Sequence, residues 1–175
     1  MARSLRRKAQ LRGTVAHQAD ALALARDAGD VVVVARGVPR SLVMRCPDGC
    51  GDILTVNLDP RAGPAWRLYQ KDGAITLFPS VWRDTGCRAH FILWDDVVFW
   101  IGEPWHSHER VELRARVAER LSDHFRSFAE IADELNEIPW SVLVECRRLV
   151  LEGRALEGRD DQQGLFRSAH QTFPF

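Results

Sequence analysis

The spacing of apolar and polar residues changes twice along the chain. Residues 14–28 carry alanine and leucine at helical spacing before Gly29, and they predict a helix. Residues 31–102 contain short runs rich in Val, Ile, Leu and aromatic residues, separated by turn residues. From Glu103 onward the spacing is helical again. The pattern therefore predicts a β-rich segment between helical ones.

Seven runs predict the strands of an antiparallel meander. In order they are VVVVAR, SLVMRC, DILTVNL, WRLYQ, AITLFPS, HFILW and DVVFWIG. The KDG segment between the fourth and fifth runs predicts a hairpin turn with positive φ at Gly73. Asp95 and Asp96 predict a second tight turn between the last two runs.

Three helices are predicted after the strands, over residues 103–125, 126–138 and 139–156. Ser127 is placed to cap the second helix, and Pro139 suits the first turn of the third. Helices of this length, followed by a short β segment, are typical of a winged helix.

The predicted fold class is α+β, a small antiparallel β-domain followed by a three-helix, winged-helix-like domain. We divide the chain into residues 1–30, a basic arm and helix; residues 31–102, the β-domain; and residues 103–175, the helical domain. With 46% hydrophobic residues, 175 residues can bury one core, or a small core plus a helical appendage. Two compact units are the upper limit.

The charge balance indicates no polyanionic partner. The chain has 24 basic and 24 acidic residues, and the basic start is most simply a solvated tail. No apolar run approaches the roughly 20 residues that cross a bilayer, so no membrane contact is expected. The first residues also lack a signal-peptide pattern. We expect a cytoplasmic protein.

The four cysteines divide into two kinds. In a reducing cytosol such a set is more typical of metal binding or inert thiols than of disulfides. Cys146 recurs with Leu143 and Val150 at helical spacing, which predicts a small core residue.

Cys46 and Cys50 flank a Pro-Asp-Gly turn, and Cys87 with His90 has the spacing of a second metal half-site. Three thiolates and one imidazole form a closed tetrahedral zinc site. The pattern therefore predicts a structural zinc that joins the starts of two strands. The alternative is a buried thiol at Cys87 and a core histidine at His90, since Cys-x-x-His also occurs by chance.

Two stretches resemble a known family. RCPDGCGDILTVNLDP and WRLYQKDGAITLFPSVWRDTGCRAHFILWDDVVFW are similar to the bacterial BubE family. The family pattern is a Cys-Pro-x-Gly-Cys-Gly turn, a Trp-Arg-Leu strand, Pro-Ser before Val or Ile, and Cys-Arg-Ser-His. The resemblance covers about residues 30–102.

The resemblance implies a serine protease that trims the C-terminus of a ubiquitin-like protein, beside the activating and conjugating enzymes of a bacterial, antiphage pathway. The family's Pro-Ser falls on Ser80, and its Cys-x-x-His on Cys87 and His90. Two positions depart from the pattern. Many members have a cysteine at the position of Asp48. The serine that usually precedes the histidine is replaced by Ala89 here. If that serine is the family nucleophile, this chain is an inactive form.

A serine protease needs a hydroxyl, a base and donors for an oxyanion. Ser80 is the best hydroxyl because it ends a strand after a proline, although it could instead cap a turn. Arg88 is a candidate to contact an oxyanion or a terminal carboxylate. The alternative is a solvated surface arginine. A zinc-bound His90 could not also act as the base. The free alternatives are His106, His108 and, on a helix, His124.

Two further functions stay open. One is a non-catalytic zinc-binding module that recognises a ubiquitin-like protein or its conjugating enzymes. The other is a DNA-binding regulator that uses the C-terminal winged helix. The last helix offers Arg147, Arg148 and Arg154 but also Glu145 and Glu152, which is a weak basic face for a groove-reading helix, so nucleic acid is disfavoured.

The tryptophans of the β-domain predict a packed aromatic layer rather than a peptide groove. They are Trp66, Trp82, Trp94 and Trp100. An exposed strand edge nearby could still accept an extended C-terminal tail by strand addition.

Overall fold

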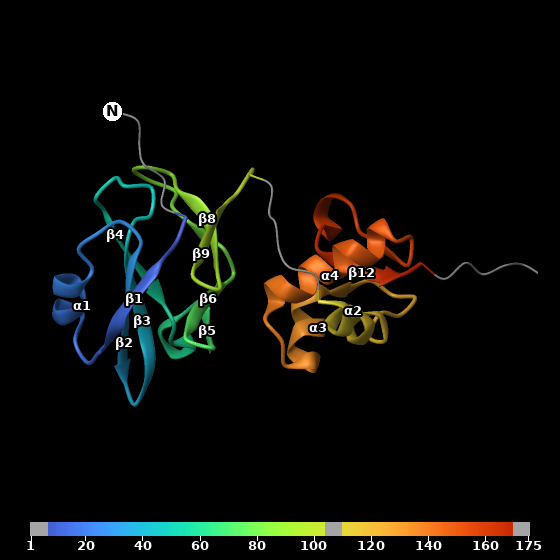
Figure 1. Cartoon of the computed structure of the whole chain (residues 1–175), viewed down its shortest axis with the longest axis horizontal. Helices are drawn as coiled ribbons and strands as arrows, with labels where there is room; N and C mark the ends of the chain where they lie inside the picture. The colour runs from blue at the N-terminus through green and yellow to red at the C-terminus, as the bar shows by residue number, and fades with distance from the viewer. Residues whose placement is uncertain (1–6, 104–109, 170–175) are drawn as a thin grey trace, which may run out of the picture. The chain divides into compact units, whose positions relative to one another are not determined.

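The computed structural model describes residues 7–103 and 110–169, and the chain is a mixture of helices and mainly antiparallel sheets. It divides into two compact units, residues 1–105 and 106–175, drawn from blue to green and from yellow to red in Figure 1. No helix within the described residues has the length and apolarity needed to cross a bilayer.

A four-stranded sheet forms the first half of the first unit. Its strands, in spatial order, are β1 (Gln10–Val15), β2 (Asp30–Arg36), β3 (Val38–Arg45) and β4 (Ile53–Asn57). β1 pairs with β2 in parallel through the crossover helix α1 (Gln18–Leu24), and the other pairs are antiparallel. Val31–Val34 are all buried because α1 covers one face of β2 and the main core covers the other.

Two smaller sheets complete the first unit. The strands β5 (Arg67–Lys71) and β6 (Ala74–Phe78) form a hairpin, and β7 (Val81–Trp82), β8 (His90–Trp94) and β9 (Val97–Trp100) form an antiparallel sheet in that order. A short 3₁₀ turn, Pro60–Ala62, precedes β5. The Asp96 carboxylate accepts the amide of Ile75 at 2.9 Å, which ties the turn between β8 and β9 to β6.

One apolar core joins these sheets. It contains side chains from β2, β3, β4, β6, β8 and β9, with Met44, Ile75 and Phe91 among those fully buried. Residues 7–9 run beside β9, with the amide of Ala9 bonded to the carbonyl of Asp96 at 2.7 Å. The first unit is therefore a sheet assembly with a shared interior, on which the site described below lies.

The second unit packs three helices with a small sheet. The elements are α2 (Val111–Ala118), β10 (Arg126–Ser127), α3 (Phe128–Leu135), α4 (Pro139–Leu151), β11 (Ala155–Glu157), a 3₁₀ turn (Asp160–Gln162) and β12 (Leu165–Ser168). The sheet order is β10-β12-β11, antiparallel throughout. Ser127 caps α3 with a reciprocal Glu130 bond, and Pro139 opens α4.

The structure agrees with all seven predicted strands and with both predicted turns. Positive φ occurs at Asp72 and Gly73 and at Asp95 and Asp96, as type I′ turns require. Cys146 is buried, as predicted, and burial raises the pKa of its thiol to about 12.

Three predictions about elements are wrong. The helix predicted over residues 14–28 is split between the end of β1 and the shorter α1. Because β1 runs parallel to β2, the sheets are not a pure antiparallel meander. The first helix after the strands ends at Ala118, so residues 119–125 of its predicted span are not helical, and residues 104–109 of that span lie outside the described residues.

Candidate functional site

Ser80 and His90 lie together on the sheet of β7, β8 and β9. β6 ends at Phe78, the Phe78–Pro79 peptide is cis, and Ser80 directly precedes β7. His90 is the first residue of β8, which pairs with β7. The Oγ atom of Ser80 is 3.1 Å from Nε2 of His90. A hydroxyl and an imidazole at this distance have the geometry of a nucleophile and its general base.

The alternation of the strands puts the chemical groups on one face and the core on the other. Trp82 pairs directly with His90, with the ring centroids 6.1 Å apart, and Ser80 precedes Trp82 by two residues. The intervening positions, Val81 and Ala89, are buried in the core, and Ala89 is only 5% exposed. A serine at position 89 would therefore be buried on the core side of the sheet, away from His90.

Two contacts hold the Ser80–His90 pair. The indole Nε1 of Trp66 donates to the carbonyl oxygen of Ser80 at 3.2 Å, and the amide of Ile101 donates to the carbonyl oxygen of His90 at 3.1 Å. In the described part of the chain no carboxylate is hydrogen-bonded to Nδ1 of His90. For Ser80 to donate its proton to Nε2, the neutral ring must carry its proton on Nδ1.

A second cluster lies at the turn between β3 and β4. The ligand atoms of Cys46, Asp48, Cys50 and Cys87, which we call the cysteine–aspartate group, lie within 4.8 Å of one another and could hold a metal ion. The sulfurs of Cys46 and Cys87 are 3.7 Å apart, and all four cysteines of the chain are free. The turn is shaped by a bond from the amide of Gly49 to the carbonyl of Cys46.

Asp48 lies inside this cluster. It is 3% exposed, and one oxygen accepts the amide of Cys50 at 2.7 Å. Burial acts to raise the pKa of the Asp48 carboxyl, but hydrogen bonds from Cys50, Cys46 and Cys87 outweigh it and lower the pKa. Burial raises the pKa values of the Cys46 and Cys50 thiols. A buried carboxylate beside three thiols is an expected arrangement for a cation site.

Arg83 balances the charge of the group. Its guanidinium lies 2.7 Å from Asp52, 3.3 Å from the Cys87 sulfur and 3.7 Å from the Cys50 sulfur. The hydrogen bond to Asp52 is the main reason that the pKa of Arg83 is raised. Gly86 has a positive φ, and a Cβ there would approach the Arg83 guanidinium to 3.1 Å, so a side chain at position 86 would crowd this arginine.

The structure brings three of the four predicted metal ligands together and places the fourth elsewhere. Cys46, Cys50 and Cys87 lie in the cysteine–aspartate group, whereas His90 is not part of it and contacts Ser80 instead. Asp48, which the sequence predicts only as a turn residue, is the fourth member of this group. The sequence does contain a signal for this role, because the family that the chain resembles often has a cysteine, a metal-ligand type, at position 48.

The other predicted site residues lie apart from these contacts. Arg88 is exposed with a positive φ of 54°, and its side chain has no hydrogen bond or ion pair within the described residues. His106 and His108 lie outside the described residues. His124 is exposed in the second unit, in the loop before β10, and contacts Asp123 at 3.5 Å.

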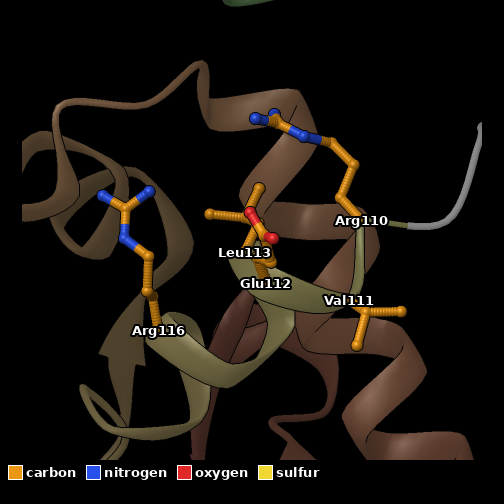
Figure 2. A pocket seen from close by; sticks show the side chains of 5 residues that line it. All are labelled: Arg110, Val111, Glu112, Leu113 and Arg116. Carbon is orange, nitrogen blue, oxygen red and sulfur yellow. The ribbon is translucent and has the colours of Figure 1, made fainter.

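A pocket in the second unit carries no comparable chemistry. It is lined by Arg110, Val111, Glu112, Leu113 and Arg116, all on α2 or directly before it (Figure 2). Both arginines form ion pairs with Glu137. It contains none of the residues of the Ser80–His90 pair or the cysteine–aspartate group.

Comparison with known proteins finds one family model that matches part of the first unit. Residues 17–101 match the family model described as "Bacterial ubiquitination-like system serine protease (BubE)". This confirms the resemblance found in the sequence. No curated protein and no solved structure matches the chain.

Proposed function

We infer that this chain, whose residues 17–101 match the family model of the bacterial ubiquitination-like system serine protease BubE, hydrolyses a peptide bond with Ser80 as nucleophile and His90 as general base. The observation that carries the proposal is the 3.1 Å contact between Ser80 Oγ and His90 Nε2 on a face of the sheet that also carries an exposed tryptophan. Ala89 does not argue for an inactive form, because its side chain lies in the core.

The chemistry follows from these two side chains. Ser80 Oγ attacks the carbonyl carbon as its proton passes to Nε2 of His90, and the imidazolium returns that proton to the leaving amine as the C–N bond breaks. A water molecule then attacks the resulting ester, His90 takes its proton, and Ser80 recovers it as the product carboxylate leaves. Arg88 is the proposed contact for the oxyanion or for a terminal carboxylate of the substrate.

We propose that the cysteine–aspartate group holds zinc. With zinc–sulfur distances of about 2.3 Å, a tetrahedral site has sulfur atoms about 3.8 Å apart, and the sulfurs of Cys46 and Cys87 are 3.7 Å apart. Four protein ligands close the site, so its role is structural. It would join the turn between β3 and β4 to the loop between β7 and β8, which leads from Ser80 to His90.

The family name supports a substrate and partners within a ubiquitin-like pathway. We propose that the protein processes the C-terminus of a ubiquitin-like protein, and that it works with the activating and conjugating enzymes of that system. The order of helices and strands in the second unit fits a winged helix. Its candidate DNA-reading arginines are engaged, Arg147 with Glu157, Arg148 with Glu145 and Arg154 with Glu152. We therefore propose that this unit docks a protein partner.

A fluorophosphonate probe tests the nucleophile directly, because it reacts with a serine activated by a neighbouring base. We expect labelling of the wild-type protein at Ser80, identified by mass spectrometry, and none of Ser80→Ala. His90→Gln should reduce labelling at least 100-fold, since general-base catalysis contributes about 10²–10⁴. The same variants should fail to cleave a ubiquitin-like precursor from the same operon.

Ala89→Ser is the matched control for the choice between the two positions. We expect Ala89→Ser to leave the labelled residue unchanged at Ser80, and Ser80→Ala combined with Ala89→Ser to remain unlabelled. Labelling at position 89, or labelling that is independent of His90, would contradict the proposal. Absence of both labelling and cleavage in the wild type would favour the non-catalytic recognition module.

A further inference from the structure

The sheet that carries the Ser80–His90 pair has an open edge beside it. β7 is the terminal strand in the order β7-β8-β9. It pairs with β8 through Val81 with Phe91 and Trp82 with His90. Within the described residues no further strand pairs with the other side of β7. A sheet edge of this kind can accept an extended peptide as an additional strand.

The phase of the backbone hydrogen bonds shows which groups face that edge. The amide of Arg83 donates to the carbonyl of Ala89 at 2.9 Å, and the carbonyl of His90 accepts from Ile101 on the side of β9. In an antiparallel ladder hydrogen-bonded and non-hydrogen-bonded pairs alternate, so Trp82 and His90 are a non-hydrogen-bonded pair. The N–H and C=O groups of Trp82 therefore point away from β8, toward the open edge.

The neighbouring backbone position is already occupied. The carbonyl of Ser80 accepts the Trp66 indole, so the open donor and acceptor belong to Trp82. The distance along a strand from Trp82 to Ser80 is two residues, or about 6–7 Å. A peptide bonded to the main chain of Trp82 would therefore place a carbonyl further along its own chain near Ser80 Oγ.

The side chain of Trp82 supports the same reading. It is 67% exposed, although it belongs to a residue type that usually covers 150–250 Å² of apolar surface. Its ring lies on the same face as His90. An exposed indole beside an open main-chain donor and acceptor is suited to an extended backbone, because the ring can cover the peptide that the edge binds.

We propose that the edge of β7 at Trp82 is the substrate-binding site, and that it takes the extended tail of a protein substrate as an added strand covered by the Trp82 indole. This rests on the proposed function, since the tail is defined by its position at the Ser80–His90 pair. The site is continuous with that pair, which favours a substrate tail over a second copy of the chain.

The test is binding of a fluorescein-labelled peptide that copies the C-terminal tail of the ubiquitin-like precursor from the same operon. Anisotropy is measured with the Ser80→Ala protein, so that no cleavage occurs. We expect Trp82→Ala to weaken peptide binding about tenfold or more, as truncation of an aromatic anchor does. Trp82→Phe should retain most of the binding affinity. Leu22→Ala is the matched control, because Leu22 is an exposed apolar residue of the same unit, on α1.

Main-chain pairing is tested separately by methylating one peptide amide at a time. Strand addition predicts that methylation at the amide facing Trp82 prevents binding and that the adjacent amides, which point outward, tolerate it. Equal tolerance at every amide, unchanged binding by Trp82→Ala, or no binding at all would overturn the inference. A dimer that Trp82→Ala dissociates would also overturn it, in favour of a second copy. Serine labelling by the fluorophosphonate probe would show in each case that the proposed function still stands.

Discussion

The guanidinium of Arg83 places a positive charge beside the sulfurs of the cysteine–aspartate group. If the cysteine–aspartate group holds zinc as proposed, three thiolates and one carboxylate around the divalent ion leave a net negative charge, and an uncompensated charge in a partly buried site is costly. Arg83 donates to the Cys87 sulfur and is oriented by Asp52, which is exposed and can remain hydrated. The loop that supplies Cys87 thus also supplies the cation that stabilises it.

Asp48 is the residue on which the identity of the fourth ligand depends. We expect Asp48→Ala to lower zinc affinity by at least about 100-fold, because it removes the buried carboxylate from the site, and Asp48→Cys to retain the metal through a fourth thiolate. Metal content and the thiolate absorption of the cobalt-substituted protein measure both. His90→Ala is the control and should keep its zinc. Zinc loss in His90→Ala with retention in Asp48→Ala would assign the fourth ligand to the histidine.

For single residues, the sequence predicts which side chains belong to a site better than it predicts which of them contact one another. Cys46, Cys50 and Cys87 can be grouped from the sequence, because cysteines that lie in turns and form no disulfide are typical of a metal site. His90 could not be assigned in this way, because its three-residue spacing from Cys87 does not show which way the side chain points. That direction depends on β8 beginning at His90 and on the pleat that places it opposite Trp82. Pairing of distant strands therefore decides between metal ligand and base.

Among the elements, the loop between α1 and β2 depends on one carboxylate. Asp30 is buried and accepts the Arg12 side chain at 2.8 Å and the amides of Asp27 and Arg26 at 2.8 and 3.0 Å. Burial acts to raise the pKa of Asp30, but these hydrogen bonds outweigh it and lower the pKa below 3.8. They join β1, the loop and β2 in one place.

We expect Asp30→Asn to destabilise the first unit by about 2 kcal/mol at neutral pH, since bonds to a charged group contribute about that much. A lowered pKa in the folded state stabilises the protein above the unfolded value, and this contribution is lost as the pH falls through the folded value. The difference between wild type and Asp30→Asn should therefore shrink below about pH 4. Denaturant unfolding across pH measures it, with the exposed Asp20→Asn as control. A difference that is constant with pH would contradict the assignment.

In the second unit α2 is attached to α4 through a buried glutamate. Glu145 is 1% exposed and accepts Arg114 at 3.1 Å, Arg148 at 2.8 Å and the amide of Arg110 at 3.2 Å. Arg114 also forms an ion pair with Glu152. Removing Glu145 would take one acceptor from Arg114 and Arg148 at a buried position, and breaking a buried ion pair costs far more than the pair contributes when intact.

We expect Glu145→Ala to lower the free energy of unfolding of the second unit by about 3–5 kcal/mol. Denaturant titration followed by helical circular dichroism measures this change, because α2, α3 and α4 account for most of the helix. Glu112→Ala, an exposed position on α2, is the matched control and should change stability by less than about 0.5 kcal/mol. A loss below about 1 kcal/mol in Glu145→Ala would mean that α2 is attached mainly by apolar packing.

The elements that the sequence predicts best are those with strong local signals. The hairpin turns at Gly73 and at Asp95–Asp96 require positive φ, and their residues are the types that tolerate it. β1 is not predicted, because its six residues contain a glycine and only two apolar side chains, Leu11 and Val15, so the helical pattern of the following alanines dominates the window. Its place in the sheet depends on parallel pairing with β2, which no local pattern specifies.

For the whole molecule, the two units have separate interiors. The core of the first unit draws its buried side chains from the strands and from the loops that carry the cysteines. The helices of the second unit bury their own apolar residues, among them Ile131, Val142 and Leu149. The four residues of the cysteine–aspartate group all belong to the first unit. Loss of the proposed zinc should therefore lower the stability of the first unit only.

Removal of zinc by a chelator tests this separation in the full chain. Zinc that binds only the folded state stabilises it by about 4 kcal/mol at a thousandfold excess over Kd. For a unit of this size that corresponds to more than about 15 °C in Tm. We expect calorimetry to show one transition lowered by that order and the other unchanged, and fluorophosphonate labelling of Ser80 to fall at temperatures where the first unit is still folded. The loop from Cys87 to His90 would no longer be fixed at its metal end, which loosens the Ser80–His90 contact.

Cys87→Ser should show the same low transition without the chelator and no further change with it. Equal shifts of both transitions, or labelling that survives chelation while the first transition falls, would contradict this account.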